Sequence, residues 1–259
     1  MIEVTNLLLP LLGALWWPFC RIMAMLTTAP VIGDAIVPVP VRALLSVVLA
    51  FLMLPITRGT PMPDPFSLAG VVTMVEQAII GGIIGFALQL TMAVVNMLGF
   101  LASSQIGFSM AQMNDPVNGQ QSDVVSGLLG LVAMLVFFGV EGHLVLAGVL
   151  GQSFHAWPVG GGWKPLLLEA VAFNVGWVFS AAILLALPIV FSTMVVQIGF
   201  GFLNRVAPSL NLFSLGFSLV TLFGLMMLVQ VVRFVPEHYV QMTNQVLEML
   251  QQQMRAAHG

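Results

Sequence analysis

Charged residues are scarce in this 259-residue chain, which has seven Lys and Arg, ten Asp and Glu and a single cysteine. Charged side chains make up 7% of the sequence, whereas they make up about a quarter of a soluble domain. A net charge of −3 without any basic run argues against nucleic acid as a partner. The lone Cys20 excludes an intrachain disulfide framework and a cysteine-based metal site.

Apolar residues make up 59% of the sequence, and its mean hydropathy is +1.05. This composition predicts an all-α integral membrane or membrane-assembled bundle. About six kinked apolar helical blocks are expected, bounded by proline, glycine or charge. Without a fixed-period repeat, residues 1–259 are predicted to form a single unit. The blocks cover residues 4–29, 37–57, 66–104, 124–156, 166–203 and 207–235.

Several blocks are too long or too interrupted for straight membrane spans. A straight helix over residues 170–204 would be about 52 Å long, against about 30 Å for the hydrocarbon core. Pro188 is therefore expected to kink or divide it. Pro18 and Arg21 interrupt the first block. The tail, residues 236–259, alternates apolar and polar side chains and is predicted to form an amphipathic helix. This helix would either lie on the membrane surface or have a specific docking role.

A stripe of small and amide residues lies within the block over residues 66–104. Its members recur at spacings of three, four or seven and therefore share one helix face. Glycines at such spacing let two helices approach closely, and amides can hydrogen-bond across the contact. Packing within the chain and a seam between subunits both fit this pattern. The residues of this helix-packing seam are Gly81, Gly85, Gln89, Asn96 and Gly99.

The segment 105–123 lacks a helical period and carries turn-forming residues at Asn114-Asp115-Pro116 and Asn118-Gly119. Its first half is free of charge and contains large flexible groups that fill irregular space well. An interfacial loop and a re-entrant plug that closes a pore are the two interpretations. The plug would comprise Gln105, Ile106, Gly107, Phe108, Ser109, Met110, Ala111, Gln112, Met113, Asn114, Asp115 and Pro116.

Arg205 is the only charged residue between Glu169 and Arg233. It stands in a polar turn between long apolar stretches, which must lie at a water interface or inside packed protein. The residues that form this hairpin and assembly site are Asn204, Arg205, Pro208, Leu210, Asn211 and Phe213.

Signals of enzymatic chemistry are weak. His143 and His155 are accompanied only by Glu141, which does not give a metal-binding spacing. The Gly160-Gly161-Gly162 run lacks a following Lys-Ser or Lys-Thr and reads as a hinge. We therefore expect neither an enzyme nor a cofactor nor a bound metal.

The order of the motifs resembles one known family. The motifs are Arg21, Ala29-Pro30, Pro40-Val41-Arg42, Glu76 with Gly81 and Gly85, Gln105-x-Gly107-x-Ser109-x-Ala111, Asp115-Pro116, Gly142-His143, Ser153-Phe154 and Asn204-Arg205-x-x-Pro208-x-Leu210-Asn211-x-Phe213. Across nearly the whole chain this pattern is similar to the FliR family of flagellar biosynthetic proteins, which belong to the type III export gate.

The resemblance implies a non-enzymatic core component of the flagellar export gate in the bacterial inner membrane, within the flagellar basal body. One copy would join FliP-like and FliQ-like subunits and further export proteins around a channel for unfolded proteins. The segment 105–123 would be its plug and the turn in 204–235 the tip of a FliQ-like hairpin, between helical blocks over 1–104 and 124–203. A virulence type III gate and a secondary transporter are the alternatives, the latter because broken helices also line transporter sites.

Overall fold

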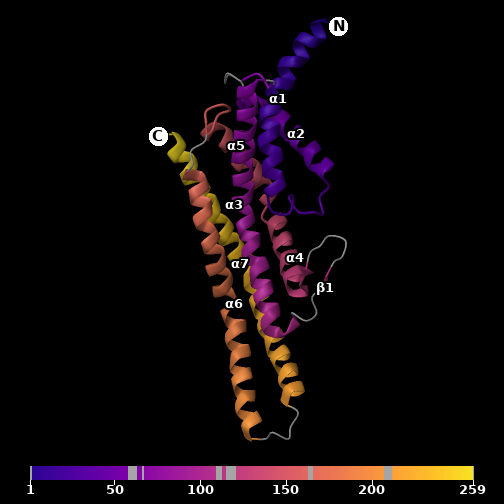
Figure 1. The fold of residues 1–259 in the computed structure, drawn as a ribbon, viewed down its shortest axis with the longest axis vertical. Coiled ribbons are helices and arrows are strands. Elements are labelled where there is room, and N and C mark those ends of the chain that lie inside the picture. Colours follow the sequence, from indigo (N-terminus) through magenta and orange to yellow (C-terminus); the bar gives the residue numbers. More distant parts are fainter. Residues whose placement is uncertain are drawn as a thin grey trace. The chain divides into compact units, whose positions relative to one another are not determined.

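The computed structural model describes residues 2–57, 63–65, 67–108, 113–114, 121–162, 166–206 and 212–258. Most of these residues are helical (Figure 1). The helices are α1 (Ile2–Thr28), α2 (Val39–Thr57), α3 (Leu68–Ile106), α4 (Val124–Gly139), α5 (Gly142–Ala156), α6 (Leu166–Val206) and α7 (Leu212–His258). Two short strands, β1 (Met113–Asn114) and β2 (Gln121–Ser122), pair antiparallel. The prediction of an all-α membrane bundle is confirmed.

Within the described residues, four helices are long and apolar enough to cross a membrane, and the bent pair of α4 and α5 would make a fifth span. The four comprise α2, α3 and the segments Leu168–Val206 and Gly216–Ala256 of α6 and α7. In α2 and in the most apolar windows of α6 and α7, less than a third of the window is buried inside the chain. Their remaining apolar surface needs lipid or partner helices to cover it.

The block predicted over residues 124–156 is two helices that bend by 65° between Gly139 and Gly142. The bend falls at Glu141, whose backbone is left-handed with a φ of 56°. A non-glycine residue adopts this conformation at a cost, so surrounding structure must hold it. The block is therefore a broken span or a re-entrant pair.

Proline did not divide the two longest helices. Pro188 lies inside α6, which continues unbroken for 41 residues. A proline removes one backbone hydrogen bond of the helix and leaves the others in place. Pro188 therefore does not divide the block, and a kink at this proline stays a prediction.

Pro236 likewise lies inside α7, a single helix of 47 residues. The predicted last apolar block and the amphipathic tail are thus one helix. A continuous stripe of buried residues at helical spacing crosses the proline. This stripe comprises Val231, Val235, Tyr239, Met242, Val246, Leu250 and Met254.

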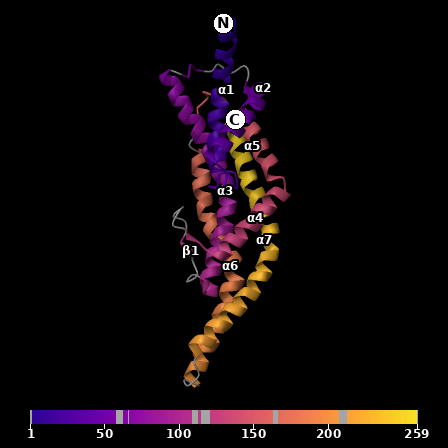
Figure 2. The ribbon, with the colours of Figure 1, turned by 90° about the vertical axis from the view of Figure 1, so that its right-hand side faces the viewer.

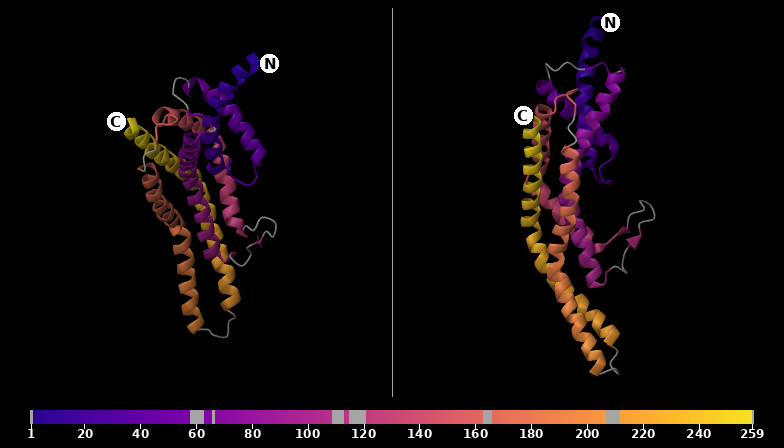
Figure 3. Two further views of the ribbon diagram at one scale, coloured as in Figure 1. Left: turned by 45° about the horizontal axis from the view of Figure 1, so that its top comes forward. Right: turned by 60° about the vertical axis from the view of Figure 1, so that its left-hand side comes forward.

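The chain divides into two compact units. Unit 1 comprises Met1–Leu90, Glu141–Asn174 and Thr243–Gly259. It contains α1 packed on α2, and α2 in turn contacts α5. Unit 2 comprises Thr91–Val140 and Val175–Met242. In unit 2, α6 and α7 run antiparallel, side by side, and extend beyond the last turn of α3 (Figures 2 and 3).

Two glycines of α3 let α1 approach closely in unit 1. A Cβ atom on Gly81 would lie 2.0 Å from the Arg21 carbonyl oxygen. A Cβ atom on Gly85 would lie 2.3 Å from the Met25 carbonyl oxygen. The Thr28 hydroxyl also donates to the Gly82 carbonyl oxygen at 2.9 Å. Since backbone atoms cannot yield as side-chain ends can, only glycine fits at positions 81 and 85.

We therefore expect Gly81→Ala to destabilise unit 1 by about 1–3 kcal/mol, as overpacking of a tight contact does. Gly82→Ala is the matched control, because a Cβ atom there meets nothing within 4 Å. Thermal unfolding of the detergent-extracted protein should show a lower midpoint for Gly81→Ala alone. Equal midpoints in the two variants would show that α1 and α3 are not in this contact.

Candidate functional site

Arg21 is fully buried in unit 1 and makes hydrogen bonds through all three of its nitrogen atoms. Nε donates to Gln77 Oε1 at 2.8 Å and Nη1 to the Ser153 carbonyl oxygen at 2.8 Å. Nη2 donates to the Trp157 carbonyl oxygen at 2.6 Å. The Phe154 ring covers the guanidinium, with its centroid 4.2 Å from Cζ. Arg21 thus connects α1 with α3 and with the end of α5.

The position of Arg21 relative to α5 is electrostatically favourable. The carbonyls of Ser153 and Trp157 belong to the last turn and C-cap of α5, where backbone oxygens have few partners within the helix. The helix dipole places partial negative charge at this end, so a cation is stabilised there. The Arg21 guanidinium therefore caps α5 from another helix.

Glu76 supplies the opposite charge for this buried cation. Its side chain is 8% exposed and interacts electrostatically with Arg21. Gln77 links the two, because its Nε2 lies 3.4 Å from Glu76 Oε1 while its own oxygen accepts from Arg21. The network therefore joins α1, α3 and the end of α5 through Arg21, Gln77 and Trp157.

The predicted plug begins inside a helix. Gln105 and Ile106 are the last residues of α3, so the expectation that they belong to a loop is wrong. The reason is that Ile106 is fully buried, which extends the helix to that point. Gly107 then turns the chain with a φ of 92°, and Phe108 follows.

Of the remaining plug residues, Met113 and Asn114 form β1, which pairs with β2 away from the helices of unit 2 (Figure 3). Ser109, Met110, Ala111, Gln112, Asp115 and Pro116 lie outside the described residues. The assignment of this segment as a plug therefore stays a prediction.

Asp123 ends this segment and begins α4. Its carboxylate accepts from the Val125 amide at 2.9 Å and from the Ser126 amide at 3.2 Å, as an N-cap does. Burial raises the pKa of the Asp123 carboxyl, but hydrogen bonds from the Ser126 hydroxyl and from these two amides outweigh this effect, and the net pKa is lowered. Asp123 therefore stays ionised at neutral pH.

The residues of the predicted seam fall in both units. Gly81 and Gly85 face α1, and a Cβ atom on Gly99 would lie 2.4 Å from Ser126 Cα in α4. Asn96 is exposed, and its carbonyl oxygen lies 3.2 Å from the Ser126 hydroxyl. The side-chain oxygen of Gln89 is buried without a hydrogen-bond partner among the described residues. The glycines contact helices of the same chain, while a seam between subunits stays a prediction.

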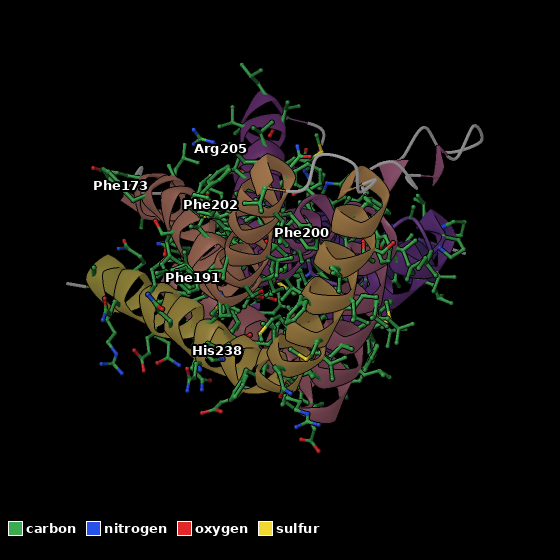
Figure 4. All side chains as sticks on the ribbon, turned by 90° about the horizontal axis from the view of Figure 1, so that it is seen from below. Phe173, Phe191, Phe200, Phe202, Arg205 and His238 are labelled. Atoms are coloured by element: carbon green, nitrogen blue, oxygen red, sulfur yellow. The ribbon has the colours of Figure 1, made fainter. Side chains whose placement is uncertain are left out.

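The hairpin site lies at the adjoining ends of α6 and α7. Asn204 and Arg205 occupy the last turn of α6 and are exposed. Figure 4 shows the Arg205 guanidinium directed away from the ribbon. Phe213 lies in α7. Pro208, Leu210 and Asn211 lie outside the described residues.

The end of α6 carries an apolar surface beside Arg205. Phe202 is 68% exposed and Val206 is 82% exposed. Phe200 instead lies between the two helices, 3.6 Å from where a Cβ atom of Gly216 would be (Figure 4). This end of the pair therefore presents one cation among uncovered apolar groups.

The described residues hold no group of three or more His, Cys, Asp and Glu side chains that could bind a metal ion. The sites that they do form are hydrogen-bonded contacts between helices, a buried cation and exposed apolar faces. This arrangement is suited to assembly with other helices, and defines the class of multi-pass helical membrane proteins.

Comparison with known sequences places the chain within this class. The family described as "Bacterial export proteins, family 1" matches residues 12–246. The chain is 32% identical to the flagellar biosynthetic protein FliR of Pectobacterium carotovorum over 238 residues, which cover 91% of this chain and 90% of that protein. It is 31% identical to FliR of Escherichia coli K12 over 229 residues, or 87% of each chain. The chain therefore belongs to family 1 of the bacterial export proteins, which confirms the resemblance to FliR.

Arg21→Lys should weaken the contacts between α1, α3 and α5, because an ammonium group cannot reach three separate acceptors in the fork geometry of a guanidinium. Each buried acceptor that is left without its donor costs about 1–3 kcal/mol. The neighbouring Cys20 is half-buried and reports on the release of α1. Maleimide labelling of Cys20 should be faster in Arg21→Lys than in Arg233→Lys, whose arginine is exposed on α7. Identical labelling rates would show that Arg21 does not hold α1 against α3 and α5.

Proposed function

We propose that this chain is a core subunit of the flagellar type III export gate. It forms, with FliP-like and FliQ-like subunits, the channel through which unfolded flagellar proteins cross the bacterial inner membrane. The observation that carries this proposal is the similarity to FliR proteins over about nine tenths of both chains. Since these relatives are named as flagellar proteins, they favour the flagellar gate over a virulence system.

The exposed apolar faces support a role in a helical assembly. A secondary transporter would bury its polar site between its own helices. Here the buried Arg21 is already satisfied by acceptors within the chain, and large apolar side chains on α2, α6 and α7 stay uncovered. Partner helices that cover these faces would complete the gate.

The hairpin site provides the first test. Because Arg205, Phe202 and Val206 are all exposed, Arg205→Leu should leave this chain folded. If Arg205 contacts a partner, the same change should reduce co-purification with the FliP-like and FliQ-like subunits and reduce motility. Arg255→Leu, at an exposed arginine near the end of α7, is the matched control. Full assembly and motility in Arg205→Leu would assign Arg205 to an ordinary interfacial turn. A native chain that purifies as a folded monomer, without either subunit, would contradict the gate itself.

The plug assignment provides the second test. A conduit wide enough for an unfolded chain must be sealed when idle, and methionine side chains suit a reversible seal because they are apolar and adapt their shape. Deleting Met110–Asn114 should therefore make the inner membrane permeable to a normally excluded small molecule while the complex still assembles. The measurement is uptake of that molecule in cells with an intact complex. Unchanged uptake would contradict the plug and favour an interfacial loop.

A further inference from the structure

The last part of α7, within unit 1, has two faces of opposite chemistry. Val246, Leu250 and Met254 are buried. The exposed residues from 244 to 255 are all polar and recur every three or four positions, so they share the other face of the helix. We call this face the polar stripe. It comprises Asn244, Gln245, Glu248, Gln251, Gln252 and Arg255.

The polar stripe differs from the uncovered face of α2, in the same unit. There the exposed groups are apolar, with Leu44 68%, Phe51 58% and Leu52 61% exposed. Lipid tails or apolar partner helices can cover such groups. They cannot cover the polar stripe, because amide and charged groups would lose their hydrogen bonds in hydrocarbon. Figure 4 shows nitrogen- and oxygen-tipped side chains directed outward along this end of α7. The stripe therefore requires water or another polar surface.

Amides dominate the polar stripe. Four of its six residues are Asn or Gln, whose side chains each carry two N–H donors and one acceptor oxygen. Glu248 and Arg255 contribute one charge of each sign, so the stripe has no net charge. An unfolded chain exposes a backbone donor and a backbone acceptor at almost every residue. Amide side chains can pair with these backbone groups whatever the sequence of the unfolded chain is.

The polar stripe also has the properties that passage of many different sequences requires. A surface along which unfolded proteins move must neither retain their apolar segments nor select one sign of charge. Beyond Phe234, no described residue of α7 is a large exposed apolar group. Hydrogen bonds to neutral amides exchange readily with hydrogen bonds to water, so each contact would be short-lived.

We propose that the polar stripe lines the water-filled conduit of the export gate, and that the backbone of an unfolded protein contacts its amides during passage. This inference rests on the proposed function as an export-gate subunit. It adds to that function a defined surface of this chain for one class of substrate, unfolded polypeptide. A stripe that faces open water and a stripe that a folded partner covers are the alternatives that experiment must distinguish.

Cysteine labelling tests whether water reaches the polar stripe. In a Cys20→Ala background, Gln252→Cys in the purified complex in lipid nanodiscs should react with a charged maleimide that does not enter lipid. Leu52→Cys is the matched control, because that position is exposed on the apolar face of α2 and should be protected by lipid or an apolar helix. Protection at Gln252→Cys would show that a folded partner covers the stripe, against the proposal.

Photo-crosslinking tests contact with the substrate. A photoreactive phenylalanine in place of Gln252 should cross-link to a flagellar export substrate that a stably folded fusion domain stalls in the gate. The same group in place of Leu52 should not. Labelling of Gln252→Cys without a cross-link at position 252, in a complex that still exports, would overturn this inference, because the stripe would then face open water. Normal flagellar export in cells that lack this chain would instead refute the proposed function.

Substitution of the amides tests why the stripe is polar. Gln245→Leu with Gln252→Leu should leave this chain folded, because both positions are exposed. The leucines would retain apolar segments of the substrate, so export should slow about fivefold in complexes of equal abundance. Gln245→Asn with Gln252→Asn keeps the amides and should export at the native rate. A native export rate in the leucine pair would contradict contact between the substrate and the stripe.

Discussion

The buried guanidinium of Arg21 is the interaction on which unit 1 depends. A charge without water must find compensating groups, and a bare guanidinium in an apolar bundle would be prohibitively unstable. Here the carbonyls at the end of α5, the Gln77 amide and the Phe154 ring provide those groups. Since the acceptors come from separate helices, satisfying the charge fixes the helices together. The same charge thus enforces specificity in a bundle that is otherwise apolar.

Small residues determine which helix contacts are possible around this cation. Apolar side chains give little directional preference, so close approach at glycine sets the register of neighbouring helices. Gly81 sets α1 against α3, Gly99 sets α4 against α3, and Gly224 sets α7 against the end of α3. In each case the group opposite the glycine belongs to a residue that also makes a side-chain or backbone hydrogen bond: Arg21, Ser126 and Ile106. Steric fit and hydrogen bonding therefore act at the same positions.

Sequence reasoning predicted the helical membrane class and the extent of α2 and α3 closely, because long apolar runs have few other folds in lipid. It marked Arg21, Glu76 and Ser153-Phe154 as separate motif residues. It did not bring them together, since contacts between residues 56 to 136 positions apart depend on tertiary packing. Gly139 and Gly142 mark the bend between α4 and α5 in the sequence. Pro188 and Pro236 do not divide α6 and α7, because a long helix tolerates the loss of one hydrogen bond.

The division between satisfied polar groups and uncovered apolar faces determines what the chain can recognise. The side chains of Arg21, Arg42 and Asp123 make hydrogen bonds within the chain, so they are not available to a partner. A partner would instead meet exposed apolar side chains. Phe191, Phe202 and Leu184 are among the most exposed of these on α6. Apolar area alone discriminates poorly between lipid and protein helices. A single exposed cation such as Arg205 among these groups changes that balance, because it requires water, a headgroup or a hydrogen-bond acceptor at one defined height along the hairpin. We therefore expect the position of that one charge to orient the apolar surface of the hairpin relative to the lipid or protein that covers it.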